Sequence, residues 1–287
     1  MNAILQTLVA GILQGGIYFL ISLGLTLIFG VAKVLNVFHG QAVIIGSYIT
    51  FWIFILYGID PYVFLPAVVA ICFIMGSGIY YVTIRPLTKS KTFEDQALLT
   101  TFGLMLLVEN VIKEVWGADP RFVNITYSGI SIPIGDLVLI PVTRLAAMMI
   151  VLICGIILYL ILAKTNMGKA IRAIGQNITS VMLMGINVDT CYAITFGVAT
   201  ALAGIAGALL SVIIPFYPGF GFELLIKGFC IVILGGMGSP SGALIGSLGL
   251  GIIESFAAFF ISSKVRDAIA YIAIITVLLI RSYARRK

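Results

Sequence analysis

The chain has 287 residues, of which 61% are hydrophobic and only 10% are charged, and its mean hydropathy is +1.18. A soluble fold of this length could not bury so large an apolar fraction, so the composition excludes one and predicts a polytopic membrane protein. The net charge of +6 then reflects basic cytoplasmic loops, and no nucleic-acid partner is needed to explain it.

The cysteines and the single histidine limit the chemistry that the chain can offer. Cys72, Cys154, Cys191 and Cys230 lie in or beside apolar segments without CxxC spacing, so we interpret them as small buried hydrophobic residues. His39 is the only histidine, which excludes a metal site built from several histidines. We therefore predict no metal site and no catalytic residue.

The apolar segments predict an all-α polytopic fold with about eight or nine transmembrane helices, forming a single transmembrane domain over residues 1–287. A bilayer core about 30 Å thick needs roughly 20 helical residues. By this measure the second span begins within residues 29–48, and the other expected spans are residues 4–30, 61–84, 96–116, 141–163, 190–213, 243–261 and 267–281.

One apolar segment in the C-terminal third is broken. The run from Leu224 to Leu234 would extend only about 17 Å as a helix, too short to cross alone, and GGMGSPSG at 235–242 interrupts it. This motif lacks the Lys-Ser/Thr ending of a nucleotide-binding loop. It predicts either a tight turn with close helix packing or part of a substrate path, and the two are compatible.

The longest weakly hydrophobic interval between two apolar segments is residues 164–189. Ile171, Ile174, Ile178 and Val181 recur there at helical spacing, which predicts one short amphipathic helix. A basic loop of this kind belongs on the cytoplasmic side. The pattern alone leaves two interpretations open, a helix resting on lipid headgroups and a docking helix for a cytoplasmic partner.

Charge bias predicts the orientation of the chain. If residues 85–95, residues 164–189, Lys33 and the C-terminal tail are cytoplasmic, eleven of the seventeen Lys and Arg residues lie inside. This arrangement requires an external N-terminus and a cytoplasmic C-terminus. It gives nine crossings if the short run from Leu224 to Leu234 also crosses.

Several polar and small residues suggest particular contacts. Ala199, Ala203, Gly207 and Ser211 recur every four residues and predict a close-packing face for another helix. Glu254 lies within an apolar span, where a carboxylate is usually paired or faces a pore.

Two further pairs of opposite charge are spaced for contact along one helix. Glu109 and Lys113 are four residues apart and predict an i,i+4 pair. Glu223 and Lys227 have the same spacing and could neutralise one another.

Three segments resemble the permeases of bacterial ABC importers for branched-chain amino acids. LNVFHGQAVIIGSY (35–48) is similar to their second-span signature, and GKAIRAIGQNITSVMLMGINV (168–188) with TFGVATALAGIAGALLS (195–211) to their coupling segment and next span. LGGMGSPSGALIGSLGLGIIES (234–255) is similar to their glycine-rich closing motif. The chain resembles the shorter of the two permease subunits along nearly its whole length.

The resemblance implies a translocation subunit of the bacterial inner membrane that binds no cofactor and hydrolyses nothing itself. It implies four partners beside membrane lipid: a second homologous permease, two cytoplasmic ATPases that bind ATP, and a periplasmic substrate-binding protein. The cargo would be leucine, isoleucine or valine. Gln41 and Asn177 stand where the family usually has acidic residues, which leaves urea or amides as alternative cargoes. A stand-alone secondary transporter or channel is the alternative function.

The resemblance also assigns residues to two sites. In the coupling segment, the glycines would form tight helix ends and Arg172 would bind a partner carboxylate or a backbone carbonyl. Arg172→Glu should then leave the membrane fold intact while weakening ATPase docking and abolishing uptake. The residues assigned to ATPase coupling are Gly168, Lys169, Arg172, Gly175, Gln176 and Gly185.

The second assigned site is the translocation path. We expect residues 223–242 to line a cavity beside the small-residue face of the sixth span, with Asn36 and His39 near the opposite wall. A hydrogen-bonded helix start is the alternative interpretation of Asn36 and His39. The residues assigned to the path are Asn36, His39, Glu223, Ser239, Ser241 and Glu254.

Overall fold

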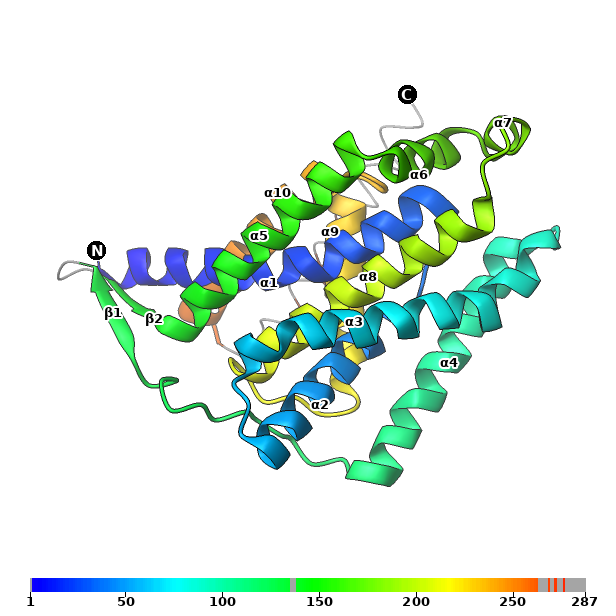
Figure 1. Ribbon diagram of the computed structural model, residues 1–287. Helices are drawn as coiled ribbons and strands as arrows, with labels where there is room; N and C mark the ends of the chain where they lie inside the picture. The colour runs from blue at the N-terminus through cyan, green and yellow to red at the C-terminus, as the bar shows by residue number, and fades with distance from the viewer. Residues whose placement is uncertain (1, 135–137, 263–267, 269–270, 273–275, 277–287) are drawn as a thin grey trace.

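The computed structural model describes residues 2–134, 138–262, 268, 271–272 and 276 and is mainly helical (Figure 1). A π-helical turn (Tyr80–Ile84) and a 3₁₀ turn (Arg85–Lys89) continue α3. The helices are α1 (Asn2–Ala32), α2 (His39–Tyr57), α3 (Pro61–Ile79), α4 (Phe93–Trp116), α5 (Val142–Lys164), α6 (Asn166–Gln176), α7 (Ile178–Leu183), α8 (Val188–Ser211), α9 (Phe220–Gly235) and α10 (Pro240–Phe260).

Six helices in the described part of the chain are long and apolar enough to cross a membrane: α1, α2, α3 with its continuation, α5, α8 and α10. Helix α4 is long enough but carries five charged residues, and α9 has only 16 residues. Helices α4 and α9 therefore remain predicted spans. Length and composition alone support six spans in the described residues, and not the expected eight or nine. Most of the expected last span, 267–281, lies outside the described residues.

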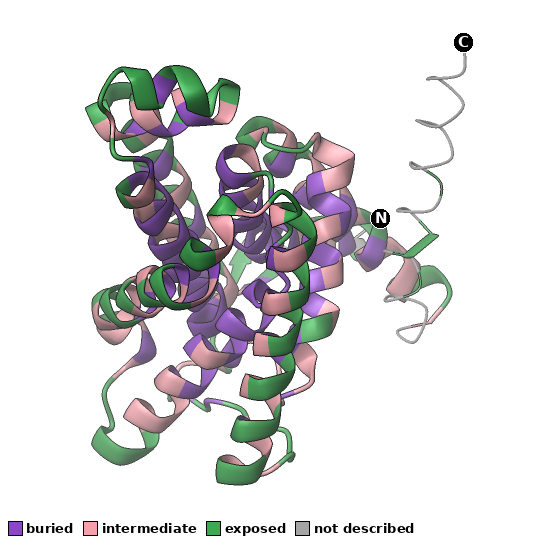
Figure 2. Cartoon of the chain, turned by 90° about the vertical axis from the view of Figure 1, so that its right-hand side faces the viewer, coloured by how far each residue is buried: buried purple, intermediate pink, exposed green. Residues whose placement is uncertain are grey.

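Helices α1 and α8 form the centre of the bundle. In each of them 89% of the most apolar 18-residue stretch is buried inside the bundle. The corresponding share is 17% for α5, 22% for α3 and 28% for α10. Figure 2 shows the same division, with buried residues at the centre and exposed residues on the outer helices. In a membrane protein, the exposed apolar faces of the outer helices meet lipid or other subunits.

Small residues allow the central helices to approach closely. The backbone of α8 at Gly207 touches α2, since a Cβ there would lie 1.9 Å from the Val43 carbonyl oxygen. The Ser47 hydroxyl of α2 donates to the Gly207 carbonyl at 2.8 Å. The predicted close-packing face of the sixth span is therefore confirmed, and its partner is α2.

The 85–95 loop and the start of α8, which follows residues 164–187, lie at one end of the bundle. Arg85 in the 85–95 loop pairs with Asp189 at the start of α8, with Nε and Oδ2 3.1 Å apart. The side chain of Gln6, near the N-terminus, instead bonds the backbone of Leu139 at the opposite end. This arrangement agrees with an N-terminus on the other side from the coupling segment.

The polar loop after α4 contains a feature that the all-α expectation lacked. Strands β1 (Ser131–Ile134) and β2 (Val138–Pro141) form an antiparallel pair. Earlier in the loop, the phenol of Tyr127 donates to Asp60 at the start of α3. Burial and this hydrogen bond raise the pKa of Tyr127, so the phenol keeps the proton that it donates.

The broken segment near the C-terminus is a helix, a tight turn and a second helix. Helix α9 begins at Phe220, four residues before the start of the predicted run, and its 16 residues extend about 24 Å, longer than predicted. Gly236 and Gly238 follow with φ of 93° and 83°, which favour glycine. Gly235 and Gly242 then bring α9 and α10 into backbone contact. The interpretation as a tight turn with close packing is confirmed.

Candidate functional site: the coupling segment and the buried polar interior

Residues 164–189 form two helices, α6 and α7, where one was predicted. The break is at Asn177, whose extended backbone ends α6 and whose Oδ1 accepts from the Ser180 amide at 3.1 Å. Asn and Asp cap helix N-termini about equally well, so asparagine suits this position as the family's usual aspartate would. The break also moves Ile178 out of the buried stripe, since it begins α7 and is exposed.

Helix α6 packs against the membrane helices of its own chain. Ile171 and Ile174 are buried, and a Cβ on Gly175 would lie 2.4 Å from the Gly30 carbonyl oxygen of α1. Gly168 touches the end of α5 in the same way. Gly168 lies in the first turn of α6 and Gly175 in its last turn, and both also permit close packing against neighbouring helices.

Gly185 is the glycine of the coupling segment that does end a helix. It follows α7 with a φ of +76°, a conformation that favours glycine, and its amide donates to the Met182 carbonyl at 3.0 Å. The prediction for Gly185 is confirmed.

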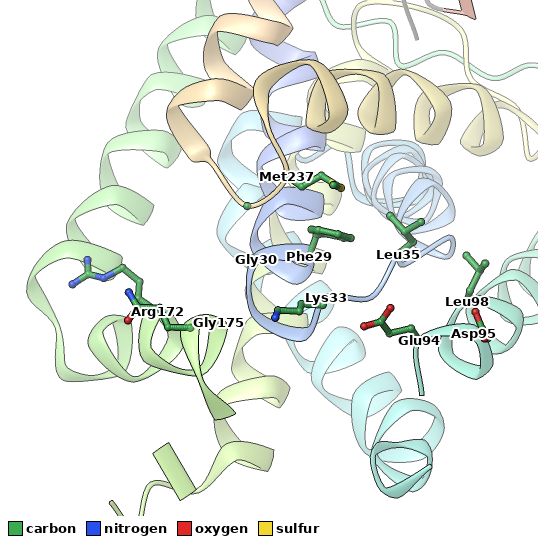
Figure 3. Close-up of a pocket in the computed structure, with 12 residues that line it drawn as sticks. Phe29, Gly30, Lys33, Leu35, Glu94, Asp95, Leu98, Arg172, Gly175 and Met237 are labelled. Carbon is green, nitrogen blue, oxygen red and sulfur yellow. The ribbon is translucent and has the colours of Figure 1, made fainter. Parts of the chain in front are cut away.

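Arg172 binds a backbone carbonyl within its own chain. Its Nη1 donates to the Leu162 carbonyl at 2.6 Å, near the C-terminal end of α5, where a cation is favourable. Figure 3 shows its guanidinium directed away from the neighbouring pocket. Lys169 and Gln176 are exposed on the same helix. A backbone carbonyl was one of the two ligands expected for Arg172, and the structure places it within the same chain.

Helix α7 and the residue after it expose an apolar run that sequence reasoning missed. Met182, Leu183 and Met184 are 56%, 85% and 75% exposed, at the end of the molecule where α6 lies (Figure 1). Contiguous exposed apolar residues mark protein or membrane contacts. The signal was present in the sequence, as the four consecutive apolar residues VMLM (181–184) inside an otherwise polar loop.

A pocket of about 680 Å³ lies between the coupling segment and the membrane helices (Figure 3). Lys33, which ends α1 with an unusual φ of +55°, lies in it, and the carboxylate of Glu94 is turned toward Lys33. Residues from α1, α4, α6 and the α9–α10 turn line it: Phe29, Gly30, Lys33, Leu35, Glu94, Asp95, Leu98, Arg172, Gly175, Gln176, Met237 and Gly238.

Three glycines beside this pocket connect α6 to the glycine-rich turn. Gly175 of α6 touches Gly30 of α1, and a Cβ on Gly30 would lie 3.2 Å from the Cα of Gly238. Both contacts are between backbones, so no flexible side chain lies between α6, α1 and the α9–α10 turn at these points.

His39 and Asn36 are buried at the start of α2. The Nε2 atom of His39 lies 3.0 Å from the Ile21 carbonyl oxygen of α1, and its amide donates to the Asn36 carbonyl. The interpretation as a hydrogen-bonded helix start is therefore confirmed for His39.

The first turns of α2 and α9 meet in the interior. A Cβ on Gly40 would lie 2.1 Å from the Gly221 carbonyl oxygen, and the Gln41 amide donates to the Pro218 carbonyl at 3.3 Å. Buried polar atoms without a hydrogen-bond partner collect at this junction: Asn36 Oδ1, His39 Nδ1 and Gln41 Oε1.

Glu254 is paired, as expected of a carboxylate in an apolar span, but its partner was not predicted. Lys227 of α9 lies 3.4 Å from Glu254 Oε1, and the Tyr18 hydroxyl of α1 donates to Oε2 at 2.7 Å. Both charged side chains are almost fully buried. The expected Glu223–Lys227 pair was wrong, since Glu223 instead accepts from the Tyr217 hydroxyl at 2.6 Å. The predicted Glu109–Lys113 pair is confirmed.

The residues assigned to the path do not gather around one cavity. Ser239 caps α10 by accepting from the Gly242 amide, and Ser241 is exposed beside it. The small-residue face of α8 is occupied by α2, while α9 packs on α1, α2 and α10. The expected position of the broken segment beside that face was therefore wrong.

Residues 7–278 match the family described as branched-chain amino acid transport system permease component. The chain is 31% identical to the high-affinity branched-chain amino acid transport system permease protein LivH of Escherichia coli, over 96% of this chain and 93% of the relative. It is 30% identical to BraD of Pseudomonas aeruginosa, over 96% and 94%, and 32% identical to a probable LivH of Methanocaldococcus jannaschii, over 88% and 82%. No solved structure matches the chain. The match across most of its length shows that this membrane protein belongs to the branched-chain amino acid permease family.

Proposed function

We propose that this chain is the permease subunit of an ABC importer that carries branched-chain amino acids across the inner membrane. The names of its relatives support the cargo. The observation that carries the proposal is the exposed run Met182–Met184. It follows α6, which is itself packed against the end of α1. Such a surface fits a subunit driven by a separate motor protein.

The complex proposed here contains a second homologous permease, two cytoplasmic ATPases and a periplasmic substrate-binding protein. ATP binds to and is hydrolysed on the ATPases, while this chain holds no cofactor. The coupling segment and the C-terminus face the cytoplasm, and the N-terminus faces the periplasm. The positions of Arg85, Asp189 and Gln6 at opposite ends of the bundle support this orientation.

In this mechanism, the ATPase binds the α7 apolar run and moves α6 with it. The backbone contacts from Gly175 to Gly30, and from Gly30 to Gly238, pass that displacement to the α9–α10 turn. Lys169 and Gln176, exposed on α6, border the same interface. The segment thus acts as a lever that converts ATPase closure into a change of helix packing.

The amino acid passes where the first turns of α2 and α9 meet. Two helix N-termini carry partial positive charge there, and separated helix ends in transporters often bind a substrate carboxylate. The buried oxygens of Asn36 and Gln41 lack partners in the packed junction, so they can bind a passing ammonium once it opens. Glu223 lies at the external edge of this path, and Ser239 and Ser241 at its cytoplasmic end.

Reconstitution tests this function against the secondary-transporter alternative. The chain is purified with its partner subunits, placed in proteoliposomes, and assayed for leucine uptake with ATP and binding protein. ATP-dependent uptake is expected, with no uptake by the chain alone under an ion gradient. Gradient-driven uptake by the chain alone would overturn the proposal, and competition with urea or amides would identify a different cargo.

A further inference from the structure

A second cavity lies on the outer surface of the bundle, between α1, α5 and α10. It is a groove of about 440 Å³ whose walls are almost entirely apolar. Phe19 and Leu23 line it from α1, Ile156 and Tyr159 from α5, and Leu244 from α10. Ile156 and Tyr159 are 58% and 69% exposed, so the groove opens to the surroundings of the bundle.

The groove lies beside the place where α5 approaches α1 at Gly155. Gly155 lines it and has no side chain to fill it, and the Phe19 ring lies 3.0 Å from where a Gly155 Cβ would be. Along a membrane-spanning helix, an apolar groove is not filled by water, because water needs polar partners. An acyl chain or an apolar segment of another protein must cover it.

Among the described residues that line this groove, Arg172 is the one with a cationic side chain. Arg172 belongs to its lining, and its guanidinium points away from the pocket in Figure 3, toward the end of α5. One of its five N–H donors binds the Leu162 carbonyl, which leaves four donors for another ligand. Because α5 ends at Lys164, this cation lies where the helix leaves the membrane.

We propose that this groove is a binding site for an anionic phospholipid. One acyl chain lies along Leu23, Ile156 and Leu244, and the headgroup phosphate binds the free donors of Arg172. Basic residues at the ends of intramembrane pockets bind anionic headgroups in this way. The site depends on α5 spanning the membrane and is independent of the transported cargo.

An acyl chain is a better occupant than a helix of the second permease. A protein segment seated over the groove would also cover Arg172 and would have to supply a carboxylate for it, because burying an unpaired cation is costly. A phospholipid supplies both the apolar chain and the negative charge. Its site also joins α5 to the coupling helix, so lipid composition would affect the anchoring of α6.

Native mass spectrometry of the purified full-length protein, with phosphatidylglycerol or phosphatidylcholine added, tests the proposal. We expect phosphatidylglycerol to be retained several times more than phosphatidylcholine. Arg172→Gln should remove this preference, and Arg172→Lys should keep most of it. Lys169→Gln, a loss of charge on the same helix away from the groove, should have no effect on retention.

A second pair of variants tests the apolar part of the site. Ile156→Trp should fill the groove and reduce retention of both lipids. Ile153→Trp, on an equally exposed position of α5 that does not line the groove, should not. Equal retention in all variants would overturn the proposal. So would a cross-link from Ile156→Cys to the second permease in the assembled complex, because the groove would then be a subunit interface.

Discussion

Helices α6 and α7 are consecutive, and each begins at a side chain that caps its N-terminus, but they face different partners. Helix α6 buries Ile171 and Ile174 and touches α1 through Gly175. Helix α7 buries Val181, while the run from Met182 to Met184 is exposed. The coupling segment is therefore divided: α6 is anchored to its own chain, and α7 exposes the apolar run that we propose as the partner surface.

This division changes which residues should control coupling. The basic and glycine residues that drew attention in the sequence belong mainly to α6, where Arg172 and Gly175 contact their own subunit. The exposed apolar residues proposed to bind the ATPase belong to α7 and the turn after it. Changes on α7 should therefore affect partner binding, and changes on α6 should affect what happens after binding.

The largest effect is expected from Leu183→Asp. Because this side chain is 85% exposed, the change should leave the fold of the chain intact. A carboxylate at the centre of an apolar interface loses its hydration without a partner, at a cost of several kcal/mol. We expect loss of ATPase co-purification and of uptake.

The conservative variant Leu183→Met is the control, because it keeps the surface apolar. Normal expression and normal ATPase binding by Leu183→Asp would show that α7 is not the docking surface.

Gly175→Leu should separate binding from coupling. Its side chain cannot fit beside the Gly30 carbonyl, so α6 must move away from α1. The exposed run on α7 is unchanged, and we expect the ATPase still to bind and hydrolyse ATP while uptake falls severalfold. The ratio of transported substrate to ATP hydrolysed measures this uncoupling.

Gly103→Leu provides a matched control, because Gly103 of α4 has no neighbour within 4 Å of its Cβ position. A normal transport ratio in Gly175→Leu would mean that the Gly175–Gly30 contact carries no displacement.

Local hydrophobic patterns predicted most of the helices, and periodicity of small residues predicted the packing face of α8. Those features depend on residues close together in sequence. The partner of Glu254 could not be predicted in this way, since Lys227 is on another helix and the spacing favoured Glu223 instead. The break at Asn177 was missed because the isoleucine spacing continues through it, although the cap residue was visible.

Variants of the Lys227–Glu254 pair test whether this contact holds α9 and α10 together as one unit that moves when α6 moves. It ties both helices to Tyr18 of α1, so the turn between them should move as a block. Lys227→Met leaves a buried carboxylate without its cation, which costs about 3–5 kcal/mol. We expect a large loss of thermal stability in detergent.

The double variant Lys227→Met, Glu254→Gln removes both charges and should recover much of that stability. Equal loss in the single and double variants would show that the pair is not coupled. The turn could then not be treated as held to α1 by this contact.

The smallest effect is expected from Arg172→Glu. The variant loses the hydrogen bond to Leu162 and places a negative charge beside the C-terminal end of α5, where the helix dipole is also negative. Because Arg172 is exposed, we expect a loss of about 1 kcal/mol in the docking of α6, and a partial loss of uptake. Arg172→Lys, which keeps the positive charge, should retain part of the uptake. ATPase co-purification should persist, since the α7 surface is untouched. If Arg172→Glu abolished co-purification without lowering thermal stability, the docking surface would lie on α6 and the division between the two helices would be wrong.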